Sequence, residues 1–158
     1  MYTAQASIRV DASQQSTWDY VSNYGNFDTW MGDIEKVKIL PDAQSEWHLG
    51  GPLGIPVSWK AVTTDIEVPR FMAWKSLEGD IQTSGFIKVE PDGTGSRITV
   101  NVEYAPPMGV VGEVFAAIFK DPQKMLEQNL EDLSEQLSKF REDAVGKPEP
   151  HFEDRVSS

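Results

Sequence analysis

The 158-residue sequence contains no cysteine and only two histidines, His48 and His151. Without cysteine there are no disulfide bonds, no thiolate metal sites and no thiol nucleophiles. A zinc site needs clustered ligands, commonly histidines, and these two histidines lie in distant parts of the chain. We therefore expect neither a metal nor another cofactor.

Positive charge is also scarce, since 14 lysines and arginines face 25 aspartates and glutamates, for a net charge of −11. Such a surface repels phosphate groups, which argues against nucleic-acid binding and against docking on anionic membranes. No apolar run approaches the roughly 20 residues of a membrane span, so no integral membrane association is expected. The segment Met1–Gln5 lacks the basic and apolar parts of a secretory signal, and we expect a cytoplasmic protein.

Aromatic side chains, by contrast, are plentiful. The chain has five tryptophans, four tyrosines and seven phenylalanines. Tryptophan is large, and its N–H group needs a hydrogen-bond partner when it is buried. This supply favours a partly wet cavity lined by aromatic rings, although a solid core would also use them.

The first third of the chain predicts one strand and two short helices. Apolar residues alternate with polar ones over Thr3–Val10, as in a strand with one buried face. Ser13 is suited to cap a helix over Gln14–Ser22 by accepting a hydrogen bond from a free backbone N–H group, and Ser16 or Asp11 could do the same. The spacing of apolar residues over 27–31 predicts a second short helix.

The residues 34–104 read as consecutive strands separated by turns rich in glycine, proline and aspartate. In the first of them, Val37 and Ile39 alternate with Lys36 and Lys38, so we expect the two apolar residues on the buried face. Because the connections are short, the strands must pair antiparallel.

The last third predicts a long helix from Asp121 to Asp143, with Asp121 as its cap and Pro122 in its first turn. At about 1.5 Å per residue it would be roughly 34 Å long, enough to cross a sheet. We expect one domain over residues 1–143 and a disordered tail over 144–158. The buried stripe of this helix is Leu126, Leu130, Leu133, Leu137 and Phe140.

These elements predict an α+β domain with two layers, a sheet and a covering helix. A sheet of seven antiparallel strands curls, and a long helix on its concave face leaves a gap or packs tightly. Alternation in the sequence does not distinguish these two outcomes.

Several short motifs follow one another in an order and spacing that are fairly specific for a fold. They are residues 10–12, 18–21, 24–27, Trp30-Met31, 51–54, 59–61, Pro69-Arg70, 74–79, Tyr104 and Pro106-Pro107. In these motifs the sequence resembles the polyketide cyclase/dehydrase and lipid-transport family of the START/Bet v 1-like superfamily, also called SRPBCC or helix-grip. The resemblance covers about residues 3–143 and implies a seven-stranded curved antiparallel sheet wrapped around a long C-terminal helix, with two short helices after the first strand. Members of the superfamily include lipid and quinone carriers, hormone receptors, aromatase/cyclases and toxins, so fold alone does not assign a function.

The candidate binding residues are those that strand alternation or helix spacing turns inward. Ser76 and Thr63 are the inward residues able to hydrogen-bond a ligand. The same residues also fit an ordinary core. The expected cavity lining is Trp30, Trp47, Trp59, Met72, Trp74, Ser76, Ile87, Tyr104, Phe115, Ile118 and Phe119.

His48 is the best general-base candidate by residue type, but alternation places it on the solvent side, where a surface histidine is expected. No catalytic constellation is recognisable, and catalytic residues stay unassigned. We therefore expect a protein that binds a hydrophobic small molecule, namely a lipid, an isoprenoid quinone or a polyketide-like aromatic. The alternatives are a cyclase/dehydrase-type enzyme that confines its substrate, and a protein-interaction module. The sequence carries no signal for an oligomeric state.

Overall fold

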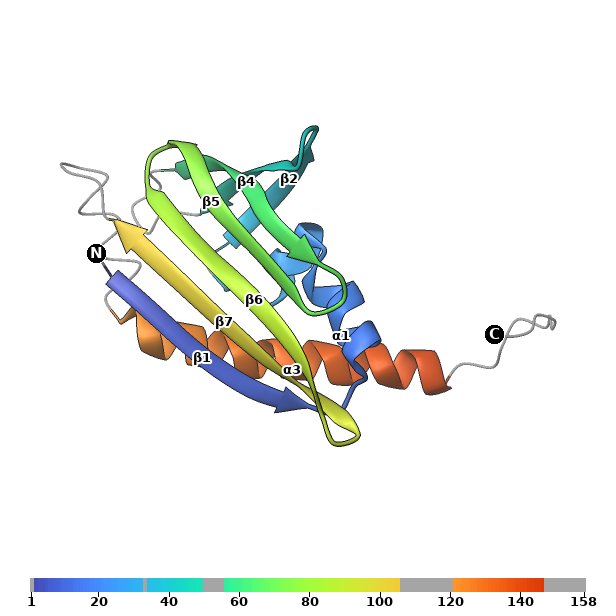
Figure 1. The fold of residues 1–158 in the computed structure, drawn as a ribbon. Helices are drawn as coiled ribbons and strands as arrows, with labels where there is room; N and C mark the ends of the chain where they lie inside the picture. Colours follow the sequence, from blue (N-terminus) through green and yellow to red (C-terminus); the bar gives the residue numbers. More distant parts are fainter. Residues whose placement is uncertain (1, 33, 50–55, 106–120, 147–158) are drawn as a thin grey trace.

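Seven antiparallel strands form one curved sheet, in the order β1-β7-β6-β5-β4-β3-β2 (Figure 1). The computed structural model describes residues 2–32, 34–49, 56–105 and 121–146, with side chains up to residue 139. The strands are β1 (Tyr2–Val10), β2 (Ile34–Leu40), β3 (Gln44–Leu49), β4 (Val57–Glu67), β5 (Phe71–Gly79), β6 (Gln82–Asp92) and β7 (Gly95–Ala105).

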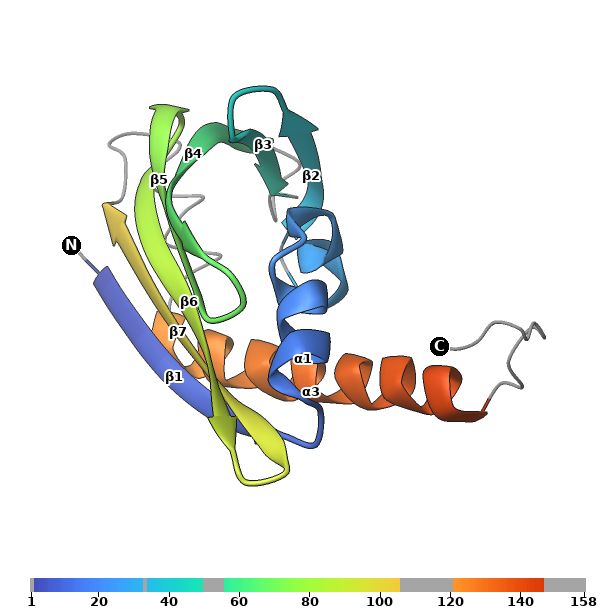
Figure 2. The same cartoon turned by 45° about the vertical axis from the view of Figure 1, so that its right-hand side comes forward.

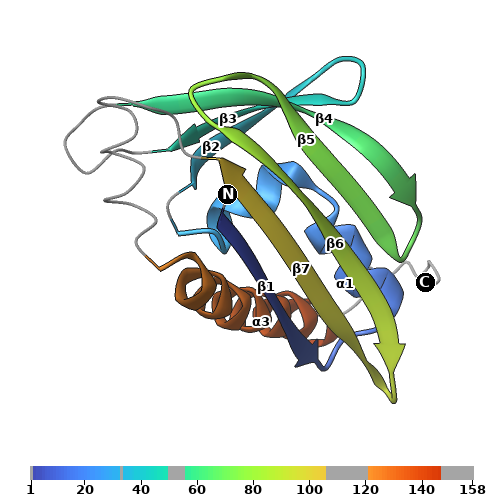
Figure 3. The same ribbon diagram turned by 60° about the vertical axis from the view of Figure 1, so that its left-hand side comes forward.

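Among the described residues, three helical segments accompany the sheet. The α-helix α1 (Gln14–Val21) and the 3-10 helix η1 (Tyr24–Thr29) follow β1, and the long helix α3 (Pro122–Gly146) comes last. The sheet curls around the concave side on which α3 lies, and α1 and η1 cover part of the same side (Figures 2 and 3). This is the helix-grip arrangement expected from the sequence.

Strand alternation builds the buried face of the sheet, as β7 illustrates. Ile98, Val100 and Val102 are buried, whereas Arg97 lies exposed on the opposite, convex face. In β1, Ala4 and Val10 are buried in the same way. The alternation of apolar and polar residues in the sequence therefore identified the inward face of these two strands correctly.

The expectation for β2 is wrong at one position. Val37 is half-buried, but Ile39 is 59% exposed. The pairing of β2 with β3 shifts register between Ile34 and Lys36, as at a β-bulge. This shift precedes both residues, however, and Ile39 keeps the parity of Val37, because they are opposite the buried Ser45 and Trp47. Ile39 is exposed because it lies near the end of β2, an edge strand of the sheet.

The helix boundaries follow the capping residues. The Ser13 hydroxyl accepts a hydrogen bond from the Ser16 N–H at 3.1 Å, and an Asp121 carboxylate oxygen accepts one from the Lys124 N–H at 3.1 Å. The Asp121 cap was predicted, and for α1 the structure selects Ser13 from the three candidates Ser13, Ser16 and Asp11. However, α3 continues to Gly146, beyond the expected end at Asp143, and residues 147–158 of the expected tail lie outside the described residues.

The second short helix differs from its prediction, because it is a 3-10 helix that ends at Thr29. Trp30 and Met31 therefore lie just after it. The side chain of Asn23 caps its start by accepting a hydrogen bond from the Gly25 N–H at 2.9 Å. The tighter 3-10 turn is common in short helical segments of this kind.

The long helix α3 also closes one edge of the sheet. The Gln123 amide donates a hydrogen bond to the Gln5 carbonyl oxygen at 2.9 Å and accepts one from the Gln5 N–H at 3.1 Å. Because β1 is an edge strand, this side chain occupies the position that a further strand would take.

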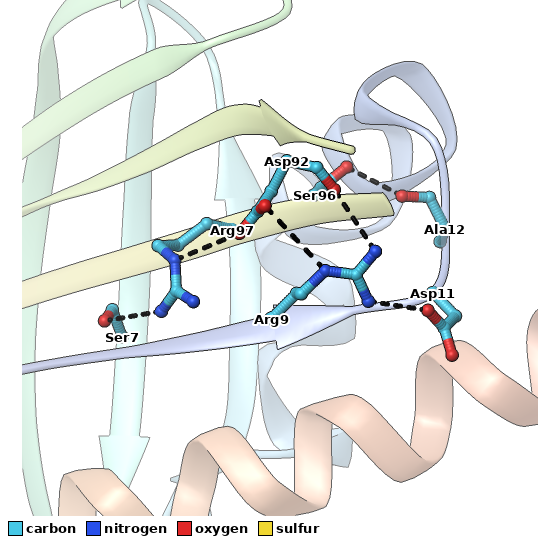
Figure 4. Close-up of polar contacts among 7 residues, drawn as sticks. All are labelled: Ser7, Arg9, Asp11, Ala12, Asp92, Ser96 and Arg97. Atoms are coloured by element: carbon cyan, nitrogen blue, oxygen red, sulfur yellow. Dashed lines mark hydrogen bonds and ion pairs between the residues drawn. The ribbon is translucent and has the colours of Figure 1, made fainter. Parts of the chain in front are cut away.

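A cluster of charged residues ties β1 to the hairpin between β6 and β7 (Figure 4). Arg9 contacts Asp11 at 2.7 Å and the Asp92 main-chain oxygen at 3.2 Å. Arg97 contacts the Asp92 carboxylate and the Ser7 hydroxyl, both at 3.3 Å. Asp92 thus links two arginines from two different strands at this end of the sheet.

Candidate functional site

A pocket with a volume of about 50 Å³ lies between the sheet, the segment around η1 and the start of α3. Every residue that lines it in the described part of the chain is uncharged, and most are apolar. Burial of apolar ligand surface is therefore the main interaction that this pocket offers. Its lining is Phe27, Met31, Ile34, Trp47, Leu49, Trp59, Trp74, Thr83, Val102, Tyr104, Pro122, Met125, Leu126 and Asn129.

Two of the pocket's indole rings lie parallel in one wall of the pocket. Trp47 on β3 and Trp59 on β4 are directly opposite each other in the sheet, and their rings stack with centroids 6.0 Å apart and an angle of 8°. The Trp47 N–H donates a hydrogen bond to the Ser45 hydroxyl at 2.8 Å, which fixes the orientation of that ring. Such a wall suits a planar apolar group.

Two glycines allow the indoles to lie close to the sheet. Trp74 is opposite Gly85, and Trp59 is opposite Gly79. A Cβ atom on Gly85 would lie 2.9 Å from the Trp74 ring and would overlap the Asn101 carbonyl oxygen. Gly79 has a φ of +130°, and a Cβ atom there would overlap the Trp59 main chain. The close approach of the strands beside Trp59 and Trp74 therefore depends on the absence of two side chains.

Tyr24 of η1 packs behind this wall. Its ring meets Trp47 edge-on, with centroids 5.5 Å apart, and it meets Trp74 edge-on at 6.3 Å. Its hydroxyl hydrogen-bonds the Thr63 hydroxyl at 2.9 Å. Burial raises the pKa of the Tyr24 phenol, although the hydrogen bond to Thr63 acts in the opposite direction. The phenol therefore stays protonated and neutral near pH 7.

Of the residues expected to line a cavity, four come together at this pocket: Trp47, Trp59, Trp74 and Tyr104. Trp30, Met72 and Ile87 are not among the residues that line it, and they are buried with at most 1% of their surface exposed. The Ser76 hydroxyl accepts a hydrogen bond from the Thr83 N–H instead. Phe115, Ile118 and Phe119, which were also predicted to line the cavity, lie outside the described residues.

The sequence reasoning missed several lining residues. Thr83 shares the inward parity of Ile87 on β6, so alternation alone was enough to find it. Asn129 follows Met125 and Leu126 at helical spacing on α3, but a polar residue beside a leucine stripe is easily taken for a surface residue. Phe27 belongs to η1, whose short apolar run gave no direction for its side chains.

His48 lies on the convex face, away from the pocket. Its Nε2 atom is 2.8 Å from a Glu46 carboxylate oxygen, and about one third of each side chain is exposed. The hydrogen bond with His48 lowers the pKa of Glu46. This pair is a surface contact between neighbouring positions on β3, and it does not touch the pocket lining.

The described part of the pocket lining holds hydroxyls and one amide, but no carboxylate, imidazole or amine. The described residues also contain no group of three or more histidines, aspartates or glutamates arranged to hold a metal ion. Among the described segments, no helix combines the length and apolar character needed to cross a membrane.

Comparison with known proteins supports the fold at low sequence identity. A Deinococcus radiodurans structure is 21% identical with a TM-score of 0.69, covering 92% of this chain and all of its own. A START superfamily protein from Mycobacterium smegmatis is 14% identical with a TM-score of 0.67, covering 89% of this chain and 99% of its own. The Zhui aromatase/cyclase of a Streptomyces species is 14% identical with a TM-score of 0.69, covering 87% of this chain and 94% of its own.

No curated protein matches this sequence. The solved structures, all below 25% identity, establish the fold alone. A family model described as polyketide cyclase/dehydrase and lipid transport matches residues 1–138. Together with the helix-grip fold, this match shows that the chain belongs to the polyketide cyclase/dehydrase and lipid transport family.

Proposed function

We propose that this protein binds a hydrophobic small molecule in the aromatic pocket between the sheet and α3. The observation that carries the proposal is the uncharged lining with three indole rings, Trp47, Trp59 and Trp74. Each Å² of apolar surface removed from water contributes about 25 cal/mol. A lipid, an isoprenoid quinone or a polyketide-like aromatic each offers such surface.

The pocket must widen to take a complete ligand. Its volume of about 50 Å³ is well below the roughly 300–1,000 Å³ of pockets that enclose drug-sized ligands. Met31 and Met125 lie in its wall. Methionine is unbranched and adopts many conformations, so these two side chains are suited to moving aside for a ring.

A second function, cyclisation or dehydration of a polyketide-like chain, is favoured by the description of the family model. An enzyme of this type accelerates a reaction by holding a flexible substrate in a folded shape. It needs few ionisable groups, which agrees with the neutral lining. Turnover that is lost when Thr83 is replaced by valine would favour this function over simple binding.

The binding proposal is tested with the purified protein in two ways. Native mass spectrometry is expected to show a co-purified apolar molecule. Titration with 2-methylnaphthalene is expected to shift amide resonances of the pocket residues in a saturable way. Absence of a bound molecule together with no saturable shift would overturn the proposal.

A further inference from the structure

The sheet splits between β5 and β6 at the end that holds the aromatic pocket. The two strands pair from Phe71–Lys88 to Lys75–Ser84 and no further. Beyond that point β5 continues to Gly79 paired only with β4, and β6 begins at Gln82 paired only with β7. Because only residues 80–81 separate the two strands in sequence, the split is the open loop end of the β5–β6 hairpin, where each strand keeps its other neighbour.

A side chain bridges the first position of the split. In register, Ser76 and Thr83 are the next pair after Lys75 and Ser84. The Ser76 hydroxyl accepts the hydrogen bond of the Thr83 N–H at 3.1 Å, in place of a main-chain carbonyl. A hydroxyl inserted in this way satisfies the Thr83 N–H group while the strands stay apart.

The split contains a cavity of about 320 Å³ that residues from both faces of the sheet line. Ser84 and Glu103 are opposite each other on the convex face, whereas Thr83 is 8% exposed and shares the inward face with Tyr104. Thr83 also lines the aromatic pocket. Thr83 is therefore common to the linings of the cavity and of the aromatic pocket, which places the two next to each other.

We infer that the split is the second half of the ligand site and holds a polar end group of a ligand whose apolar ring lies among the indoles. The inference rests on the proposed function and adds the chemical class of the ligand. It also accounts for size, because the aromatic pocket alone is too small for a whole ligand while the split adds a cavity of about 320 Å³.

The charged residues at the split determine which polar end group of the ligand can bind there. Glu78 and Glu103 line the cavity together with the hydroxyls of Ser76 and Ser84, and no lysine or arginine is among its described lining residues. Carboxylates accept hydrogen bonds and repel anions. The ligand is therefore an amphiphile with an ammonium or hydroxyl end group, and fatty acids and phosphate-bearing lipids are disfavoured.

The test uses three probes that share one ring: 2-methylnaphthalene, 2-naphthylmethylammonium and 2-naphthylacetate. For the wild-type protein, calorimetry at low salt is expected to give the tightest binding for the ammonium and the weakest for the carboxylate. In the double variant Glu78→Gln/Glu103→Gln, the affinity for the ammonium should fall by about five-fold, as expected for partly exposed charges. Binding of 2-methylnaphthalene should not change.

A matched control separates the split from the net charge of the protein. The double variant Glu131→Gln/Glu135→Gln removes the same charge from exposed positions on α3, and should leave all three affinities unchanged. Equal losses in both double variants, or an acetate that binds as tightly as the ammonium, would overturn the inference and leave the proposed function intact. If the wild-type protein binds none of the probes, the proposed function fails and the inference fails with it.

Discussion

The two ends of the sheet are built differently. At the end of the β6–β7 hairpin, pairing is complete to Asp92–Gly95, Arg9 and Arg97 share Asp92, and the Ser96 hydroxyl donates a hydrogen bond to the Ala12 carbonyl oxygen at 2.7 Å (Figure 4). At the pocket end, β5 and β6 separate and uncharged side chains surround a hollow.

This difference assigns different tasks to the two ends. Polar cross-links between strands hold the hairpin end in one arrangement. The pocket end lacks one ladder of hydrogen bonds, and regions with fewer such bonds open at lower free energy. A protein that must admit a ligand therefore has its adaptable part at the pocket end and its most firmly held part at the hairpin end.

The largest effect is expected for Gly85→Val at the pocket end. The new side chain would overlap the Asn101 carbonyl oxygen and press on the Trp74 ring, and we expect the free energy of unfolding to fall by about 3 kcal/mol or more. Urea denaturation measures this change. Gly32→Ala is the control, because a Cβ atom there meets nothing within 4 Å. Equal stability of the two variants would contradict the close seating of Trp74.

Trp74→Ala compared with Ile87→Ala separates the pocket from the core. Both residues are buried on the same face, but only Trp74 lines the pocket. Each substitution is expected to lower the free energy of unfolding by about 3 kcal/mol. Trp74→Ala should also weaken binding of 2-methylnaphthalene by about ten-fold, whereas Ile87→Ala should leave it unchanged. Equal affinities in the two variants would remove Trp74 from the site.

Asp92→Asn tests the hairpin end. The substitution weakens contacts to both Arg9 and Arg97, which are partly exposed, so we expect a loss of about 1 kcal/mol in low salt and less in high salt. Probe binding should not change. Thermal denaturation at two salt concentrations measures the effect, with Glu131→Gln as the control. A change in ligand affinity would show that the two ends are coupled.

The smallest effect is expected for Gln123→Ala at the edge of β1. Loss of two hydrogen bonds to exposed main-chain groups should cost about 0.5–1 kcal/mol and speed hydrogen exchange of the Gln5 amide. Gln128→Ala is the control, because the Gln128 amide reaches only the Asp132 side chain one turn further along α3. Unchanged exchange at Gln5 would mean that water replaces the Gln123 amide fully.

Sequence patterns predicted which face of the sheet a residue occupies better than whether that residue lines the pocket or the closed core. Trp74 and Ile87 share a face, but Ile87 is opposite Met72, further toward the hairpin end, where the core is closed. Whether an inward residue lines a pocket therefore depends on what covers that part of the sheet, and alternation carries no information on this. Ile39 shows the second limit, since it has inward parity opposite the buried Ser45 but is exposed near the end of the edge strand β2.

Capping chemistry, in contrast, was readable because it is local. Ser13 and Asp121 act within a few residues of their own positions, so no knowledge of the tertiary structure was needed to find them. The Trp59–Gly79 and Trp74–Gly85 pairs were not found from sequence, since each depends on the register between two strands.

The Gln123 amide has a consequence for self-association of this protein. It occupies the outer main-chain groups of Gln5, so a strand from another molecule cannot add there until α3 moves away. Fibril growth or domain exchange through the sheet would then have to start at β2, the opposite border, where Lys36 and Lys38 are both exposed. Lysines on an edge strand oppose the addition of another strand. Both edges of the sheet therefore resist such pairing, β1 through the Gln123 amide and β2 through its lysine charges.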